Sequence, residues 1–389
     1  MTEPAPPIAL RMTDIRPFQV MELLARARQL EAAGRTIVHM EIGEPDFPSP
    51  LPVVEAGLRA VTSGEIHYTP SAGLSELREA IAKSYADRYG ADVDPVRIII
   101  TPGSSGALLL IMGVLVNPGA EVLLTDPGYP ANRNFVLFAG GVPRGLPVEA
   151  ATGYQFSPEM LEAAWGPKTV SGIIATPSNP TGTVVPTPAL KRMIDFAAAR
   201  GGRLIIDEIY HGLTYEGGVE TALNLSGSVF VMNSFSKYYG MTGWRIGWLV
   251  APKDFVREAE KLAQNIFISA PSPAQYAALA AFSPQTTAIL EERRAEFQRR
   301  RDFLVPALKA LGFRIPVTPE GAFYLYADCS AFTEDSFAFC RDALERAGVA
   351  FTPGMDFGTH LAGRHVRFAY TTSMAQIEEG VERLRRFLR

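Results

Sequence analysis

The sequence predicts an α/β protein with a mostly parallel main sheet and a smaller α+β unit beside it. Three observations indicate this. The chain has 389 residues, enough at roughly 150 residues per domain for two or three domains. From about Val96, short apolar runs alternate with helix-favouring or turn-rich stretches, which is typical of a parallel sheet with crossover connections. Beyond residue 312, strand-like and helix-like runs continue in a shorter region.

Composition and charge exclude several classes of protein. The chain is 47% hydrophobic and 20% charged, as in ordinary folded proteins, and its formal net charge is -4. Without a basic excess we expect no nucleic-acid partner and no binding to anionic membranes. The longest apolar run, 108–116, is too short to cross a bilayer. Because no secretory signal is visible and Cys329 and Cys340 are expected to stay reduced, we expect a cytoplasmic address.

The predicted elements follow in chain order. Helices are expected over 12–33, 51–63 and 74–89, with a strand over 36–42. The main sheet is expected to use the apolar runs at 97–101, 121–125, 171–176, 203–207, 229–234 and 246–250. Because 97–101 and 172–175 are apolar throughout, we expect both to be central strands covered on both faces. A charged helix within 285–312 then leads to strands at 322–328 and 365–370, with a helix at 336–347 between them.

Polar, glycine-rich clusters follow the ends of successive predicted strands. They lie at 102–106, 126–129, 177–182, 207–210 and 234–237. Ligands of open parallel sheets bind outside the carboxyl ends of the strands, so these clusters are expected to meet in one crevice.

Two of these clusters point to chemistry. The first, 103–106, precedes an apolar helix and could bind a phosphate at the helix N-terminus, although taken alone the motif more often is a plain serine cap. It is neither a GxGxxG nor a P-loop, which disfavours NAD and ATP. The second contains Lys237, which can form a Schiff base if burial near Arg245 lowers its pKa. A lysine facing water is the alternative.

The string around Lys237 decides between these readings. Ser234-x-x-Lys237 followed by Arg245-Ile246-Gly247 resembles the pyridoxal-phosphate attachment signature of class I/II aminotransferases, which share the fold of aspartate aminotransferase, known as fold type I. The resemblance runs along the whole chain, through 42–47, 68–69, 178–182, 207–210 and Arg367. It implies a large domain over 48–285 with a mostly parallel seven-stranded sheet, and a small α+β domain built from 1–47 and 286–389.

The resemblance also implies pyridoxal 5'-phosphate as cofactor and assigns residues to it. Lys237 would form the Schiff base and then serve as catalytic acid and base. Asp207 would face the pyridinium nitrogen, Asn179 and Tyr210 the phenolic oxygen, and Tyr129 the ring.

Further residues would bind the phosphate and the substrate. The phosphate ligands implied by the resemblance are Ser104, Ser105, Ser234, Ser236, Arg245 and, from a neighbouring subunit, Tyr68. Arg367 would bind the substrate α-carboxylate, beside Gly43 and Asn179. A homodimer with shared active sites follows from the role of Tyr68.

Other candidates have weaker signals. The five histidines show no spacing that suggests a metal site, so no metal is expected. We assign Phe323 and Tyr324 to the core rather than the site. Phe18, Ile42 and Ile268 are candidates for lining the substrate pocket, but the sequence does not place them.

The predicted function is transfer of an amino group from an α-amino acid to a 2-oxo acid by a ping-pong mechanism. A β-eliminating lyase on the same fold remains the alternative, because the two reactions differ only in their later steps. A DNA-binding regulator is disfavoured, since no basic helix-turn-helix is visible before residue 42. A related group of aspartate aminotransferases has lysine where this chain has Ser105, so a dedicated dicarboxylate site is less favoured here.

Overall fold

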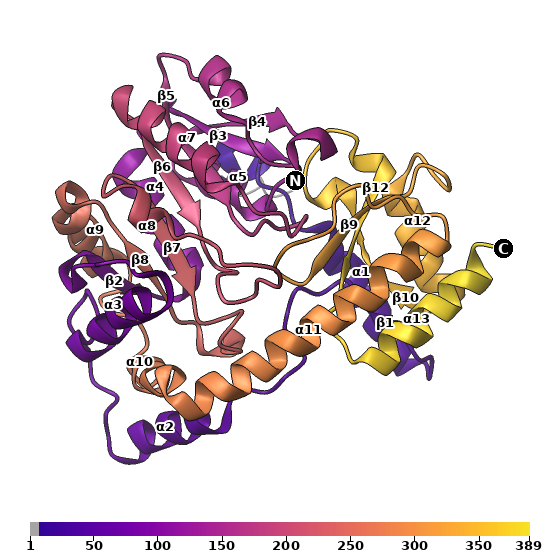
Figure 1. Cartoon of the computed structure of the whole chain (residues 1–389), viewed down its shortest axis with the longest axis horizontal. Helices are drawn as coiled ribbons and strands as arrows, with labels where there is room; N and C mark the ends of the chain where they lie inside the picture. Colours follow the sequence, from indigo (N-terminus) through magenta and orange to yellow (C-terminus); the bar gives the residue numbers. More distant parts are fainter. Residues whose placement is uncertain (1–7) are drawn as a thin grey trace, which may run out of the picture.

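A seven-stranded sheet organises the larger part of the molecule (Figure 1). The computed structural model describes residues 8–389, so the first seven residues of the segment expected in the small domain lie outside it. The strand order is β2-β8-β7-β6-β5-β3-β4. The bounds are β2 Ile98–Thr101, β3 Glu121–Asp126, β4 Val142–Pro147, β5 Thr169–Ala175, β6 Arg203–Asp207, β7 Phe230–Ser234 and β8 Gly247–Val250.

The sheet is mixed but mostly parallel, which confirms the predicted fold class. Strand β8 runs antiparallel to both β2 and β7, and the other neighbouring strands pair in parallel. The sequence did not reveal β4, because Pro143, Pro147 and Gly145 lie in it and each of its residues is either exposed or half-buried. Such residues are tolerated because β4 is an edge strand.

The expectation that residues 97–101 form a central strand was wrong. Strand β2 lies at the opposite edge of the sheet from β4, yet all four of its residues are buried. The N–H of Ile100 donates to the carbonyl oxygen of Ala72 at 2.9 Å, and helix α3 (Ser75–Tyr89) packs against the strand. The apolar run therefore indicated that the strand is covered on both faces, but it did not indicate where the strand lies in the sheet.

The core lies on both faces of this sheet, as the alternation of strand side chains requires. Ile99 belongs to a cluster with helices α4 (Gly103–Leu115) and α9 (Lys253–Ile266). Ile98 and Ile100 belong to the larger cluster on the other side. That cluster or its margin includes residues from α3, α6 (Pro158–Ala164), α7 (Thr187–Ala199), α8 (Ala222–Leu225) and α10 (Ser272–Leu279). Helix α5 (Pro130–Phe138) contacts α4 and β4.

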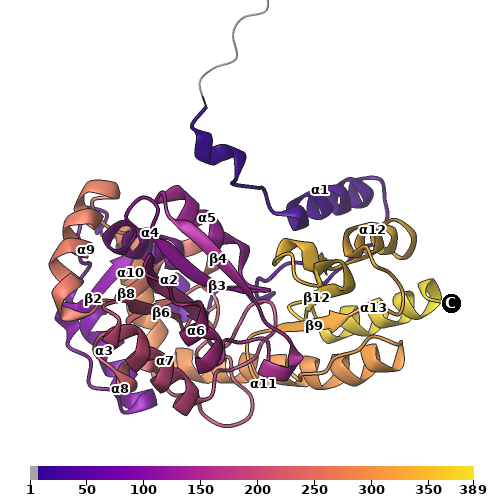
Figure 2. The ribbon, with the colours of Figure 1, turned by 90° about the horizontal axis from the view of Figure 1, so that it is seen from above.

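Residues 19–39 and the part of the chain that follows helix α11 build the smaller unit together (Figure 2). Strand β1 (Val38–His39) pairs in parallel with β10 (Val349–Ala350). An antiparallel sheet has the order β11-β12-β9, with bounds Thr352–Pro353, His365–Ala369 and Tyr324–Asp328. Helices α1 (Gln19–Ala32), α12 (Ser336–Asp342) and α13 (Met374–Phe387) lie around these strands.

Two predicted elements in this unit are shorter than expected. Helix α1 begins at Gln19 rather than residue 12, because Pro17 disfavours helical backbone at the residue before it. A separate 3-10 turn covers Leu10–Thr13. The strand expected over 36–42 pairs only at Val38–His39, and residues 40–43 then run toward the main sheet.

Helix α11 (Pro284–Ala310) connects the two units and includes Pro306. Figure 1 shows it running from the neighbourhood of α2 (Leu51–Thr62) and α10 to that of α13. The buried guanidinium of Arg300, on this helix, binds Asp46 through two hydrogen bonds of 2.8 and 3.1 Å. We keep the domain boundaries near residues 48 and 285 as a proposal.

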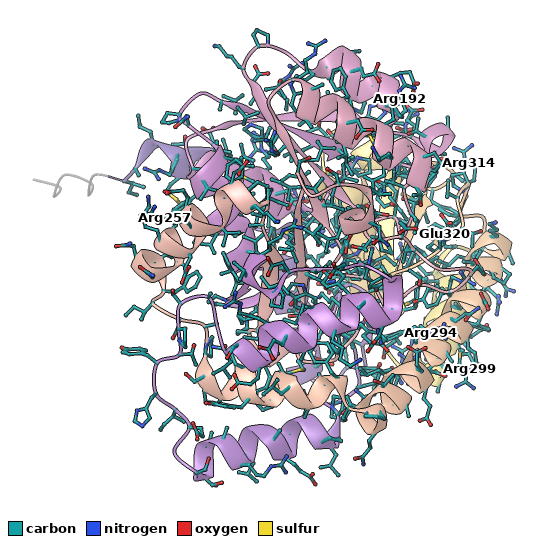
Figure 3. All side chains as sticks on the ribbon, turned by 60° about the vertical axis from the view of Figure 1, so that its left-hand side comes forward. Arg192, Arg257, Arg294, Arg299, Arg314 and Glu320 are labelled. Atoms are coloured by element: carbon teal, nitrogen blue, oxygen red, sulfur yellow. The ribbon has the colours of Figure 1, made fainter. Side chains whose placement is uncertain are left out.

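Charged side chains mark the outside of the molecule. Arg192, Arg257 and Arg299 lie at its periphery in Figure 3. Within residues 8–389 no helix is both long enough and apolar enough to cross a membrane.

Candidate active site

A cavity of about 480 Å³ lies at the carboxyl ends of the strands, where the polar clusters were predicted to meet. Its wall combines loops after β2, β3, β5, β6 and β7 with residues from the smaller unit. The predicted site residues in the wall are Gly43, Ser104, Ser105, Tyr129, Asn179, Asp207, Tyr210, Ser236, Lys237, Arg245 and Arg367. Residues as far apart in the chain as Gly43 and Arg367 therefore line one cavity.

Two of the predicted residues lie elsewhere. Ser234 is buried behind Ser236: their hydroxyl oxygens are 2.9 Å apart, and the N–H of Ser236 donates to the Ser234 oxygen at 3.1 Å. This places Ser234 as a support for Ser236 rather than in the cavity wall. Tyr68 is 80% exposed and also lies outside the wall of its own chain's cavity.

The assignment of Tyr324 to the core alone was wrong. Its side chain is buried but forms part of the wall, with its hydroxyl 2.8 Å from that of Tyr210. A Cβ atom at position 43 would lie only 2.0 Å from the Tyr324 hydroxyl, so the close approach of this ring requires glycine there. The pairing of Gly43 with Tyr324 joins distant segments, and no local pattern in the sequence signals it.

The candidates for the substrate pocket separate in the structure. Ile42 lies in the cavity wall. The Phe18 ring is 6.5 Å from the ring of Tyr129, which is in the wall, but Phe18 itself is not. Ile268 is exposed, and Phe323 is buried outside the wall. Glu44 and Thr242 line the cavity as well; neither was predicted as a site residue, although Glu44 lies within the 42–47 motif and Thr242 within the string around Lys237.

Lys237 lies just after the end of β7, with its amine inside the cavity. The Nζ atom donates to the carbonyl oxygen of Gly43 at 2.6 Å. Burial lowers the lysine's pKa to about 8; Glu44 and Asp207 oppose this shift, and Arg367 and Arg245 add to it. A neutral amine, the nucleophilic form, is therefore within reach near neutral pH.

Asp207 ends strand β6 and is buried at the bottom of the site. Its Oδ1 accepts from the N–H of Ile209 at 3.0 Å. Burial raises the pKa of the carboxyl to about 7, while the Ile209 N–H and the charge of Lys237 oppose the rise. A cationic N–H placed against this carboxylate would favour its ionised form.

One end of the cavity carries a helix start, two serines and an arginine that could bind an anion. Helix α4 begins at Gly103, and Ser104 and Ser105 present hydroxyl and backbone N–H groups in its first turn. Arg245 has a left-handed backbone (φ 54°), and its Nη1 donates to the carbonyl oxygen of Thr242 at 3.0 Å. A Cβ at Gly103 would lie 2.4 Å from Nη2 of Arg245, so glycine lets the guanidinium approach the helix start.

Arg367 supplies a second cationic group, from strand β12 of the smaller unit. Its Nη1 donates to Oδ1 of Asn179 at 2.9 Å, and its Nη2 donates to the carbonyl oxygen of Glu41 at 2.6 Å. The guanidinium carbon lies 4.3 Å from the ring centroid of Tyr324. Within the described chain, 8–389, Nε is buried without a hydrogen-bond partner. This orphaned donor on an oriented fork suits a carboxylate ligand.

Comparison with known proteins identifies the family. Residues 35–384 match the family described as aminotransferase class I and II. The chain belongs to this family. Its fold and its reaction, amino-group transfer, are therefore those of the class I and II aminotransferases, as the attachment signature around Lys237 predicted.

Individual aminotransferases resemble the chain over its whole length. It is 39% identical to the (5-formylfuran-3-yl)methyl phosphate transaminase of Methanocaldococcus jannaschii, over 98% of this chain and 99% of that one. It is 38% identical to the valine–pyruvate aminotransferase of Mycobacterium tuberculosis, over 97% of both. The aspartate aminotransferase of Thermus thermophilus with maleate superposes with a TM-score of 0.92 at 34% identity, covering 98% and 99%. These names span chemically different substrates.

Proposed function

We propose that this aminotransferase binds pyridoxal 5'-phosphate and moves the amino group of an α-amino acid to a 2-oxo acid in a ping-pong cycle. One observation carries the proposal. The buried amine of Lys237 shares a single cavity with an anion-binding end at Arg245, a buried carboxylate at Asp207 and the partly unpaired fork of Arg367. In that order, the four groups match the aldehyde, the phosphate and the ring nitrogen of the cofactor, and the carboxylate of the substrate.

The residues present fit this cofactor. The start of α4, with Ser104 and Ser105, would hold the phosphate together with Ser236 and Arg245, whose Nη1 lies 3.5 Å from the Ser236 hydroxyl. Tyr129, which is in the cavity wall, would cover the ring face. When bound, pyridoxal phosphate supplies an electron sink for negative charge that develops at the substrate α-carbon.

Lys237 would carry the proton transfers of the reaction. Because burial lowers its pKa to about 8, its Nζ can lose a proton near neutral pH and then accept one from the substrate α-carbon. The hydrogen bond from Nζ to the Gly43 carbonyl holds the amine two residues along the backbone from the Glu41 carbonyl that accepts from Arg367. The same atom is thereby kept close to the place where the substrate α-carbon must lie.

Asp207, Tyr210 and Asn179 would set the electronic state of the ring. The Asp207 carboxylate would keep a proton on the pyridine nitrogen. Burial raises the pKa of the Tyr210 phenol well above its usual value, so Tyr210 keeps its proton and can donate to the phenolic oxygen. Asn179 holds Arg367 through Oδ1, which leaves its amide N–H group free to turn toward the same oxygen.

Arg367 would bind the α-carboxylate of each substrate. Asn179 and Glu41 hold its two Nη atoms, and the orphaned Nε then defines the side on which a carboxylate can bind. A planar fork of this kind orients the carboxylate as well as attracting it. We therefore propose that Arg367 binds the carboxylate in both half-reactions, that of the amino acid and that of the 2-oxo acid.

A homodimer with shared sites would complete the cavity. Tyr68 extends into solvent, and helix α2 next to it exposes Leu51, Val54, Leu58 and Val61 at helical spacing. An apolar face of this kind on a water-facing helix favours coverage by another protein surface. We propose that a second copy covers it and that Tyr68 reaches the phosphate end of the partner's cavity.

The side chain of the substrate is less defined. Ser105 stands where a related group of aspartate aminotransferases has a lysine, and the other cations of the wall, Arg245 and Arg367, already have proposed ligands. We therefore favour donors without a distal carboxylate.

We also propose that the enzyme works in a reducing, cytoplasmic compartment, because Cys329 and Cys340 are buried free thiols in the part of the chain that the structure describes.

A donor panel tests the proposed function. Each competent amino acid should change the absorbance of the bound cofactor in a single turnover, and adding a 2-oxo acid should restore the absorbance and release a stoichiometric new amino acid. A β-lyase would instead give pyruvate and ammonia from a β-substituted amino acid without an acceptor. A purified protein that binds no cofactor, or that yields only ammonia, would refute the proposal.

A further inference from the structure

Residues 40–43 form a backbone segment that contacts two of the charged groups of the proposed chemistry, Arg367 and Lys237. Four successive carbonyl oxygens accept hydrogen bonds from the far end of the chain and from the main sheet. The pairs are Met40 with the Ala369 N–H at 2.7 Å, Glu41 with Arg367 Nη2 at 2.6 Å, Ile42 with Thr371 Oγ1 at 2.7 Å and Gly43 with Lys237 Nζ at 2.6 Å. We name residues 40–43 the carbonyl segment. Its position decides where Arg367 and Lys237 lie relative to each other.

One side chain of this segment is a fully buried carboxylate. Glu41 is 0% exposed, and its Oε1 lies 2.7 Å from Nδ1 of His39. Its Oε2 is buried and has no hydrogen-bond partner among residues 8–389. The other ring nitrogen of His39 faces Glu31 on helix α1 at 3.1 Å, on the solvent side. The reaction as proposed above uses neither His39 nor Glu41.

A buried carboxylate is costly unless a partner compensates it. Transfer of an unpaired charge into the protein interior is strongly unfavourable, and breaking a buried pair by removing one partner is strongly destabilising. Here the compensating partner is His39, because the hydrogen bond with Glu41 raises the pKa of the imidazole to about 9, with Glu31 adding to the rise and burial opposing it. The Glu41 side chain is therefore fixed at one location.

The carboxylate and the carbonyl that Arg367 contacts belong to the same residue. Fixing the Glu41 side chain fixes the orientation of its peptide group, which also accepts from Thr352 Oγ1 at 3.0 Å. Thr352 lies opposite Arg367 in the antiparallel pairing of β11 and β12, and its hydroxyl accepts from Nη2 at 3.2 Å. The guanidinium is thus clamped between its own sheet and the carbonyl segment.

We propose that Glu41, held by His39, is a positioning residue for Arg367 and through it determines how tightly the enzyme binds α-carboxylates. The inference rests on the proposed role of Arg367 in substrate binding. Glu41 touches neither substrate nor cofactor; it sets the direction in which the unpaired Nε of Arg367 points. Loss of the pair lets the carbonyl segment rotate, and Arg367 then keeps its charge but loses its orientation.

The test compares variants that differ only in the buried pair. Glu41→Ala removes the carboxylate, and Glu41→Gln keeps the volume without the charge. Glu31→Gln is the matched control, because it removes the carboxylate on the exposed side of the same imidazole. For each holoenzyme the half-reaction is followed with the best donor of the amino-acid panel and with its decarboxylated amine, such as L-valine and isobutylamine. Thermal unfolding and cofactor absorbance show that fold and cofactor are retained.

We expect the KM of Glu41→Ala for the amino acid to rise about tenfold, the effect of weakening one charged hydrogen bond, with kcat nearly unchanged. The kcat/KM for the amine should stay near the wild-type value, because the amine has no carboxylate for Arg367. Glu41→Gln should show a smaller rise in KM, and Glu31→Gln should show none. If the amine reacts too slowly to measure, a raised KM at constant kcat carries the same meaning.

An amino-acid KM within twofold of wild type in Glu41→Ala would overturn the inference, as would equal losses for the amino acid and the amine. If Glu41→Ala does not fold, the KM values of Glu41→Gln and His39→Gln decide by the same criteria. Arg367→Lys separates this inference from the proposed function. If Arg367→Lys raises KM and the Glu41 variants do not, only the positioning role fails; if Arg367→Lys also leaves KM unchanged, the assignment of the anchor fails.

Discussion

The amine of Lys237 donates a 2.6 Å hydrogen bond to the carbonyl oxygen of Gly43, which ties the end of strand β7 to the segment leading out of the smaller unit. The contact joins residues 194 positions apart. Because Gly43 also makes room for Tyr324, one glycine brings the lysine, the tyrosine pair and the Arg367 anchor into a common space.

Lys237→Ala should leave a folded protein that binds pyridoxal phosphate without a covalent link and barely turns over, since the imine-forming amine and the catalytic base are lost together. Borohydride reduction of the wild-type holoenzyme followed by peptide mapping should place the label on Lys237. The exposed Lys191 offers a control variant, Lys191→Ala, which should keep full activity. Label on a lysine other than Lys237 contradicts the assignment.

The reactivity of Lys237 should follow a pKa of about 8, which burial holds below the usual lysine value. The neutral amine is the reactive form, so labelling of Lys237 by an amine-selective reagent in cofactor-free protein should reach half of its maximum near pH 8 and level off at higher pH. Nα-acetyl-lysine in the same tube, whose side-chain amine has an ordinary pKa of about 10.4, should keep gaining reactivity well beyond that point. A Lys237 profile parallel to that of Nα-acetyl-lysine is the result that would disprove the shift.

Asp207→Ala should bind the cofactor weakly and lose at least about a hundredfold in kcat, because the ring nitrogen loses its counterion. Cofactor affinity by dialysis titration and single-turnover rates measure the two effects separately. Asp195→Ala, at an exposed position on helix α7, provides the control. Near-normal turnover of Asp207→Ala would rule out the proposed role.

Arg367→Lys should keep the cofactor spectrum but raise the KM for amino acids strongly, since the charge remains and the planar fork is lost. Lysine cannot replace the paired contacts of the two Nη atoms with Asn179 and Glu41. The measurement is steady-state KM for several donors beside the exposed control Arg192→Lys. Unchanged KM values across the donors would show that another group binds the carboxylate.

Mixing Lys237→Ala and Tyr68→Ala subunits should restore activity if Tyr68 serves the neighbouring chain. Each mixed dimer then has one site with both native residues, and random assortment places about half of the dimers in this class. The measurement is turnover after co-refolding equal amounts, with heterodimers confirmed by differential tagging. Activity equal to the mean of the two parents, despite confirmed heterodimers, would mean that Tyr68 serves its own chain.

Much of the cavity could be predicted because it depends on local strings placed at strand ends. The clusters around Ser104, Asn179, Asp207 and Lys237 each follow an apolar strand, and a parallel sheet brings such ends to one edge. To predict that these clusters meet, it was therefore enough to recognise the strands. The family resemblance put Ser234 among the phosphate ligands, whereas its hydroxyl lies against Ser236.

The remaining features depend on pairings that a sequence does not display. The contact of Arg367 with the Glu41 carbonyl spans 326 positions, and nothing near either residue signals it. Tyr324 lies in an apolar strand whose composition favours the core, and only its approach to Gly43 and Tyr210 brings it into the wall. Strand β2 is likewise buried although it lies at an edge of the sheet, because Ala72 and helix α3 cover it.

The antiparallel insertion of β8 between β2 and β7 has a consequence for the order of folding. Strand β2 pairs within the main sheet with β8 alone, so it cannot enter the sheet until residues 247–250 have been synthesised. The backbone of Gly103 packs directly against Gly247, where a Cβ atom would lie 2.8 Å from the Gly103 carbonyl carbon. The start of α4 is therefore positioned by a contact of high sequence separation, and we expect such a contact to close late. We predict that the parallel strands β3 to β7 assemble first during synthesis, and that the phosphate end proposed for the cavity forms only when β8 arrives.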